Sequence, residues 1–258
     1  MPNKQHGHYV EPESLEKLAS TVRKEDKEIT LEIMNIKPND KIIDIGCGPA
    51  VDTINFAKKT GNKGEVVGID YDEEMIEIAN LRTKENGLEK ILTHIRYDII
   101  EPKKIPYPDN YFDITHTDRV LFHNKNPEYI LQEMIRVTKP GGKIIAKGED
   151  ISSWSWSPFS LEQDHFIKRK MSSVMHYWNF PKNSLFLFKK YKLIDINIKV
   201  IPVVNKDFYG DKAALIHFKR FGISKKKAIE FIKMANEYND QGAYYDIMNV
   251  IITYGIKP

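Results

Sequence analysis

A short stretch, KIIDIGCGPA at residues 41–50, constrains the fold of this chain more than any other segment. Its isoleucines form an apolar run that is typical of a strand buried on both faces. Gly46 and Gly48 then bracket a turn, which requires unusual backbone dihedrals or a ligand close to the main chain. Residues 52–59 have the pattern of a helix. A strand, a glycine turn and a helix N-terminus in this order predict a binding site for a nucleotide-like ligand.

The loop departs from a dinucleotide-binding fingerprint in two ways. The pattern G-x-G-x-x-G/A requires a small residue at position 51, where this chain has Val51. The chain also has an acid, Asp44, two residues before the first glycine, where a pyrophosphate would meet a like charge. A carboxylate at that position suits a ligand with a cationic end.

Asp44, Gly46 and Gly48, in the order D-I-G-C-G, resemble the first motif of the class I S-adenosylmethionine-dependent methyltransferases. The resemblance extends from about residue 41 to residue 147. Within the family, the sequence is similar to members that modify quinones and natural products. It implies an α/β fold: a seven-stranded, mainly parallel sheet with helices on both faces and a partly helical cap. The chain's own pattern supports the alternation of strands and helices, whereas the strand count comes from the resemblance.

The same resemblance assigns cofactor-binding roles to acids at the ends of predicted strands. Asp70 follows Gly48 at about the spacing expected of a ribose-binding acid, and Asp72 is the better candidate for capping the next helix. Asp98 would recognise the adenine amino edge, unless it is a solvated loop acid, and Ile99 would lie against the adenine face. The full cofactor-binding set is Asp44, Gly46, Gly48, Asp70, Tyr71, Met75, Asp98, Ile99 and Asp118. Met75 could equally be a core residue, and Asp118 could cap the next helix.

Candidates for the substrate side lie after the fourth predicted strand and in an aromatic-rich segment beyond it. His123 is the candidate general base, because imidazole titrates near neutrality; the alternative is a histidine that fixes the loop by hydrogen bonds. Arg119 either contacts substrate or pairs with an acid. All three tryptophans lie between residues 151 and 180, which suits a lid over an apolar or aromatic acceptor or a small accessory core. The candidate substrate residues are Tyr9, Arg119, Trp154, Trp156 and Trp178.

The chain as a whole, 1–258, is expected to form a single methyltransferase domain with additions. Residues 1–35 would form a helix preceded by an arm, which either folds over the cofactor or is disordered. Two excursions, 151–190 and 205–245, would form the cap. The sixth strand, 192–204 and broken at Pro202, is expected between the two excursions, and the seventh strand, 246–254, after them. Two helices, 211–220 and 224–239, are expected within the second excursion.

Composition excludes several classes of chemistry. Basic and acidic residues nearly balance, 39 against 36, so the excess of +3 favours no charged partner. The single cysteine, Cys47, excludes disulfides, a cysteine-based metal cage and a radical iron–sulfur cluster, and we predict no metal site. No apolar run reaches the length of a membrane span, and the N-terminus has no signal pattern, which predicts a cytoplasmic protein.

These features predict methyl transfer from S-adenosylmethionine to a small organic acceptor, aromatic or apolar, by in-line displacement. Holding the nucleophile, methyl carbon and sulfur in line at about 3 Å supplies much of the catalysis, so no dedicated catalytic residue is required. Methylation of RNA or protein is one alternative, although the residues after strand four read T-D-R-V and no RNA-binding module is visible. A catalytically silent cofactor-binding regulator is the other. The sequence leaves the acceptor atom and a homo-oligomeric state open.

Overall fold

The computed structural model describes residues 24–98, 103–174, 177, 179–208 and 210–258. Seven strands form one sheet in the order β3-β2-β1-β4-β5-β7-β6. Neighbouring strands from β3 to β5 are parallel, and β7 runs antiparallel to both β5 and β6. The strands are β1 (Lys41–Ile45), β2 (Glu65–Asp70), β3 (Leu92–Arg96), β4 (Phe112–Asp118), β5 (Thr138–Ser157), β6 (Ile194–Asn205) and β7 (Tyr245–Ile256).

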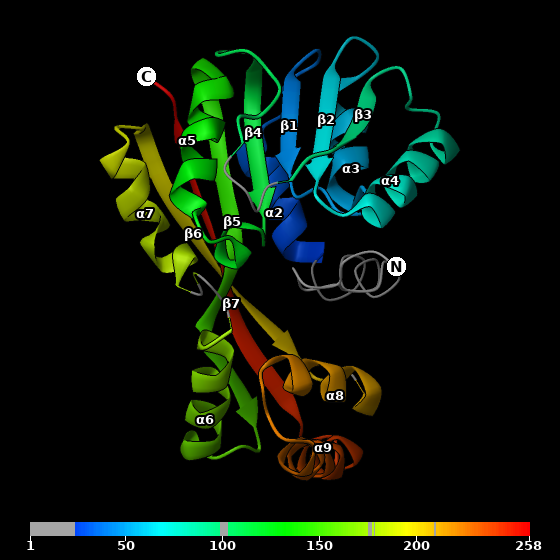
Figure 1. The fold of residues 1–258 in the computed structure, drawn as a ribbon, viewed down its shortest axis with the longest axis vertical. Coiled ribbons are helices and arrows are strands. Elements are labelled where there is room, and N and C mark those ends of the chain that lie inside the picture. Colours follow the sequence, from blue (N-terminus) through cyan, green and yellow to red (C-terminus); the bar gives the residue numbers. More distant parts are fainter. Residues whose placement is uncertain (1–23, 99–102, 175–176, 178, 209) are drawn as a thin grey trace.

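Helices cover both faces of this sheet (Figure 1). α2, α3 and α4 contribute to the hydrophobic core on one face, and α5 and α7 to the core on the other. The predicted seven-stranded, mainly parallel sheet with helices on both faces is therefore confirmed. The described helices are α2 (Lys24–Met34), α3 (Val51–Thr60), α4 (Glu73–Glu85), the 3-10 turn η2 (Leu121–His123), α5 (Pro127–Val137), α6 (Leu161–Ser172), α7 (Phe180–Lys190), α8 (Asp211–Arg220) and α9 (Lys225–Asp240).

β1 lies at the centre of the parallel half, which explains its continuous apolar sequence. Ile42 packs into the core beneath α2 and α3, whereas Ile43 and Ile45 pack into the core beneath α5 and α7. A strand covered by helices on both sides has no solvated face, so it needs no polar alternation. Its parallel neighbours β2 and β4 end at the same edge of the sheet as β1, and that edge is where ligands bind in open α/β folds.

β5, β6 and β7 extend far beyond the carboxyl ends of the parallel strands and carry three helices at their far ends (Figure 1). We call α6, α8 and α9, together with the outer parts of β5 and β7, the cap. The cap has its own hydrophobic core, separate from the two cores of the main sheet. Its buried residues are Ile151, Trp156, Ile167, Met171, Ala214, Phe218, Phe221, Ile223, Ala228, Phe231, Ile232 and Met248.

The structure corrects three boundaries in this region. Residues 151–157, expected in the first cap excursion, continue β5 along β7. The end of that excursion is α7, whose Phe180 and Phe188 are buried in the core of the main sheet. β6 is not broken at Pro202, which pairs with Asn249. β6 is an edge strand, and an edge position tolerates a residue without an N–H.

In the described part of the chain, no helix has the length and apolar character that crossing a membrane requires. Within the same ranges, no three His, Cys, Asp or Glu side chains are grouped as metal ligands would be.

Candidate cofactor and substrate site

The glycine loop follows β1 at the carboxyl edge of the sheet, and its two glycines serve different purposes. Gly46 has φ +75°, and a Cβ built there would lie 2.1 Å from Cγ2 of Val120. Gly46 thus lets the loop after β4 pack against the loop after β1. Gly48 has φ +52°, and a Cβ there would meet no atom of the described residues within 4 Å. The space in front of Gly48 is therefore open to a ligand that approaches the backbone closely.

Asp70 ends β2 and is bonded to the glycine loop. Its Oδ2 accepts a hydrogen bond from Gly48 N at 2.9 Å, and its Oδ1 accepts one from Asp72 N at 3.0 Å. Burial raises the pKa of Asp70, and these two backbone N–H groups act against that rise. Because a carboxylate offers about four acceptor positions, each oxygen keeps one for a further donor, such as a ribose hydroxyl.

Asp72 begins α4, as predicted. Its Oδ1 accepts from Glu74 N at 2.9 Å and from Met75 N at 3.5 Å, which makes Asp72 the N-cap of that helix. Asp70 is thereby free of the capping role that was its alternative. The neighbouring cofactor candidates also lie here: Met75 is buried in the first turn of α4, and Tyr71 is half-buried, with its pKa raised to about 12 chiefly by burial.

Asp98 is half-buried just beyond β3, and Ile99 lies outside the described residues, so the structure does not test either adenine contact.

Asp44 is buried in β1 and has a partner that sequence reasoning missed. Directly opposite on β4 is His116, whose Nδ1 lies 2.7 Å from Asp44 Oδ1. The pKa of Asp44 is raised overall, because the effect of burial exceeds the opposing effect of His116. The only signal in the sequence was a histidine inside the strand FDITHTD, because the register that places it against Asp44 joins residues far apart in the chain.

Asp118, at the end of β4, belongs to a buried ion network. Lys147 Nζ lies 3.3 Å from Asp118 Oδ2 and 2.6 Å from Asp26 Oδ2 of α2, and Arg119 Nε lies 3.3 Å from Asp118 Oδ1. The N-cap of the following turn, η2, is Val120, and no side chain caps this turn by a hydrogen bond. The prediction that Asp118 could cap it is therefore wrong. Arg119 pairs with an acid, as its alternative stated.

The aromatic candidates divide between the cap and the undescribed ranges. Trp156 is 8% exposed and packs against Trp154 and Phe159, with ring centroids 4.8 Å and 6.3 Å apart. Its expected place in a substrate wall is thus corrected to one in the cap core. Trp154 is half-buried, and its Nε1 donates to Asp246 Oδ1 at 3.1 Å. Tyr9 and Trp178 lie outside the described residues.

His123, the candidate base, ends η2 and is half-buried. Its ring lies against Phe122, with centroids 4.2 Å apart.

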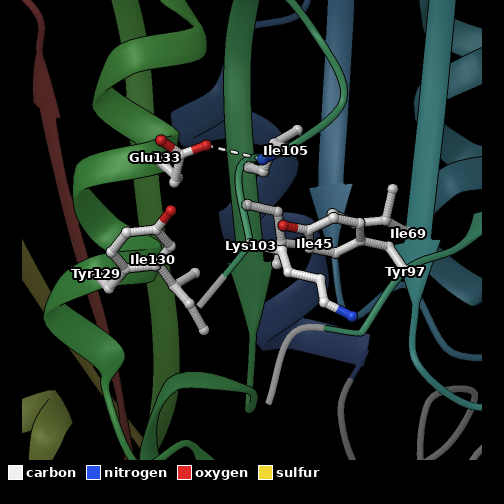
Figure 2. A pocket seen from close by; sticks show the side chains of 8 residues that line it. All are labelled: Ile45, Ile69, Tyr97, Lys103, Ile105, Tyr129, Ile130 and Glu133. Atoms are coloured by element: carbon white, nitrogen blue, oxygen red, sulfur yellow. Dashed lines mark hydrogen bonds between the residues drawn. The ribbon is translucent and has the colours of Figure 1, made fainter. Parts of the chain in front are cut away.

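A small cavity lies between the ends of β1 and β2 and helix α5 (Figure 2). Its volume of about 10 Å³ is room for about one water molecule. Tyr97 Oη is buried there and has no hydrogen-bond partner among the described residues, and Glu133 Oε2 accepts from Ile105 N at 2.7 Å. The cavity is too small for an adenine ring or an acceptor, so it is not the substrate site. Its lining residues are Ile45, Ile69, Tyr97, Lys103, Ile105, Tyr129, Ile130 and Glu133.

Residues 36–210 match the model of a family described as methyltransferase domain. The chain belongs to this methyltransferase family. Its sheet and glycine loop are those of the class I S-adenosylmethionine-dependent methyltransferases, which confirms the resemblance that the sequence indicated. S-adenosylmethionine is the cofactor of this class, and the open face of Gly48 with the unused acceptor positions of Asp70 fits its nucleoside part.

Relatives of this methyltransferase include enzymes of quinone biosynthesis. It is 37% identical over 117 residues to a demethylmenaquinone methyltransferase of Bacillus cytotoxicus, covering 45% of this chain and 47% of that protein. It is 27% identical over 179 residues to a ubiquinone/menaquinone biosynthesis C-methyltransferase of Shewanella oneidensis, covering 68% of this chain and 66% of that one. The chain spans about half the length of the first curated relatives it matches.

The methyltransferase also resembles the crystal structure of a Bacillus halodurans protein described as a putative methyltransferase. The TM-score is 0.63 at 18% identity, over 91% of this chain and 99% of that chain. At this identity the likeness establishes the fold alone.

Proposed function

We propose that this methyltransferase transfers the methyl group of S-adenosylmethionine to a small organic acceptor, aromatic or apolar, and releases S-adenosylhomocysteine. The observation that carries the proposal is the bond between Asp70 and the amide of Gly48, which sets an acceptor carboxylate beside an open stretch of backbone. That arrangement suits a ligand with a ribose and an extended chain. A metal is not required for such a reaction.

Each residue at the edge of the sheet has a proposed task. Asp70 accepts from the ribose hydroxyls, Gly48 admits the cofactor to the backbone, and Asp44 faces its cationic amino-acid end. Tyr71, Met75, Asp98, Ile99 and Asp118 remain predicted members of the same pocket. The cofactor supplies a methyl carbon already activated by a sulfonium, so the residues of this chain mainly need to hold an acceptor in line and exclude water.

The acceptor class rests on the relatives and on the cap. Two relatives carry the names of methyltransferases of menaquinone and ubiquinone biosynthesis. The cap extends past the carboxyl edge of the sheet, where an acceptor would meet the cofactor (Figure 1). Tyr9, Arg119, His123, Trp154 and Trp178 remain the candidates on the acceptor side. We further propose that the protein is cytoplasmic and that nucleic acid is not its substrate.

The test is an assay with S-adenosylmethionine labelled in its methyl group. The purified protein is mixed in parallel with hydroquinones and phenols, with total RNA and with a protein extract. Label should move to at least one hydroquinone or phenol, and Asp70→Asn should reduce that transfer. Label in RNA or protein alone would overturn the acceptor class, and no transfer with a protein that binds the cofactor would indicate a catalytically silent binder.

A further inference from the structure

The pair formed by Asp44 and His116 is one of the deeply buried polar contacts at the site. The two side chains are only 4% and 1% exposed, and they face each other across β1 and β4. The ring of His116 also meets Phe56 of α3 edge-on, with centroids 5.3 Å apart. Asp44 and Phe56 thus hold the ring in one orientation, and the role of His116 depends on which ring nitrogen carries the proton.

Hydrogen bonding assigns that proton. His116 Nε2 is buried and has no hydrogen-bond partner among the described residues, whereas Nδ1 lies against Asp44 Oδ1. A proton on Nε2 would be a buried donor without an acceptor, which costs free energy. The proton therefore lies on Nδ1 and is donated to Asp44, so the imidazole is neutral and the pair keeps the negative charge of the carboxylate.

Asp70 accepts from backbone N–H groups, whereas three other acids of this region are paired with full positive charges. Asp52 of α3 pairs with Lys27 of α2 at 2.5 Å. Asp26 and Asp118 share Lys147 of β5, and Arg119 also contacts Asp118. Glu149 of β5 acts electrostatically on Arg119 as well. Asp44 is the acid in this network whose described partner is a neutral imidazole, so its charge is available to a cation.

The carboxylate of Asp44 also lies beside the glycine loop. Burial, followed by the charges of Asp70 and Asp44, raises the pKa of the Cys47 thiol, which sits between Gly46 and Gly48. In the described chain, His116 is the hydrogen-bond donor to Asp44, and it uses one of the two carboxylate oxygens. The other oxygen is left for a ligand.

We infer that His116 is a positioning residue for the amino-acid end of the cofactor: by donating from Nδ1, it fixes the Asp44 carboxylate so that its second oxygen can accept from the ligand's ammonium. The inference rests on the proposed function, because it requires S-adenosylmethionine in this loop. His116 does not touch the methyl group or the acceptor. Its effect is confined to the part of the cofactor beyond the sulfur.

The experiment measures calorimetric binding of two ligands to the wild-type protein, to two variants of His116 and to one control variant. S-adenosylhomocysteine carries the amino-acid end, and methylthioadenosine has the same nucleoside without it. His116→Leu removes the donor with little change in volume and should weaken S-adenosylhomocysteine binding by about tenfold, the value of one hydrogen bond to a charged group, while methylthioadenosine binding stays unchanged. His116→Asn offers an amide donor at the position of Nδ1 and should restore most of the lost affinity.

Thr115→Val is the matched control. Thr115 lies next to His116 in β4, is fully buried, and its hydroxyl is 3.0 Å from Thr138 Oγ1 on the opposite face of the strand. Its substitution removes a buried polar contact and should lower the melting temperature without changing the affinity for either ligand.

Two results would overturn the inference: an equal loss for both ligands in His116→Leu, or no loss for either in a folded variant. Failure of the wild-type protein to bind either adenosyl ligand is a different result, since it would overturn the proposed function itself.

Discussion

At the carboxyl edge of β1 and β4 several buried side chains are polar or charged, whereas the core of the cap is apolar and rich in aromatic rings. Asp44 pairs with His116, and Asp118 pairs with Lys147. In the cap, by contrast, Phe231 is fully buried, and the rings of Phe159, Phe166 and Phe218 surround it. Burying charge is costly and persists where function or specificity needs it, whereas burying aromatic rings is a common source of stability. Many of the aromatic residues of the cap therefore serve packing, and Trp154 and Trp178 remain candidates on the acceptor side.

The largest effect is expected when the side chain at the centre of the cap core is removed, which tests whether the cap supplies stability independently of the cofactor site. Phe231→Ala should lower the free energy of unfolding by about 3–5 kcal/mol, because it leaves a large cavity among packed rings. Cofactor affinity at a temperature where the variant is folded should be unchanged. Denaturant unfolding and calorimetric titration measure the two quantities. The control is Phe186→Ala, since Phe186 is 67% exposed on α7 and should shift stability by less than about 0.5 kcal/mol.

A weakened cofactor affinity in the folded Phe231→Ala variant would contradict the separation of the two regions.

The second prediction concerns pH and the main sheet. His94 of β3 is 7% exposed and contacts Thr53 Oγ1 at 3.0 Å, and burial lowers its pKa from 6.5 to about 4. As the pH falls below 6.5, His94 becomes protonated in the unfolded chain but stays neutral in the folded chain. The stability contributed by neutral His94 is therefore complete above that pH and is lost progressively toward pH 4, by about 3 kcal/mol in all.

Urea unfolding at several values between about pH 7 and pH 4.5 checks this expectation. His94→Gln cannot titrate, so its stability should fall less steeply than that of the parent over the same interval. Parallel curves for the two proteins would show that His94 is not the group responsible.

The third prediction tests the ribose contact. Asp70→Ala should weaken binding of S-adenosylmethionine by about 1.5–3 kcal/mol, the value of a hydrogen bond to a charged group. Asp70→Asn keeps acceptor oxygen at one position and should lose less. Calorimetric titration gives both affinities, and circular dichroism confirms that the variants are folded. If Asp70→Ala binds the cofactor as tightly as the parent, the ribose assignment is wrong.

The smallest expected effect comes from adding one methyl group at a glycine of the proposed cofactor site and, as a control, at a glycine outside it. Gly48→Ala and Gly87→Ala each place a Cβ at positive φ, +52° and +66°, where no atom of the described residues lies within 4 Å. Each should lower stability by about 1–2 kcal/mol for the left-handed backbone. Only Gly48→Ala should also weaken cofactor binding, because its methyl group enters the space proposed for the ligand. Equal cofactor affinity in the two variants would place the ligand elsewhere.

Much of the parallel half could be predicted because its signals are local. The apolar run of β1 and the capping residue Asp72 each depend on a few neighbouring positions, and both match the structure. α8 also has the predicted bounds, 211–220. Such features are fixed by strand burial and by hydrogen bonds to nearby backbone, which sequence patterns record directly.

The rest depends on contacts between distant segments. The outer part of β5 carries serines and tryptophans without a clear apolar alternation, and it is a strand because Ser155 pairs with Ile247 of β7. The contact of His116 with Asp44 likewise needs the β1–β4 register. Lys147 of β5 also forms a buried ion pair with Asp26 of α2, which is far away in the sequence. No window of sequence contains both partners of any of these pairs.

The central claim is that the glycine loop and Asp70 bind an adenosyl cofactor. Calorimetric titration of S-adenosylmethionine and S-adenosylhomocysteine into the purified wild-type protein, with NAD as the control, tests it most directly. The account predicts micromolar binding of both adenosyl ligands and none of NAD. A folded, ligand-free protein that binds neither adenosyl ligand would contradict it.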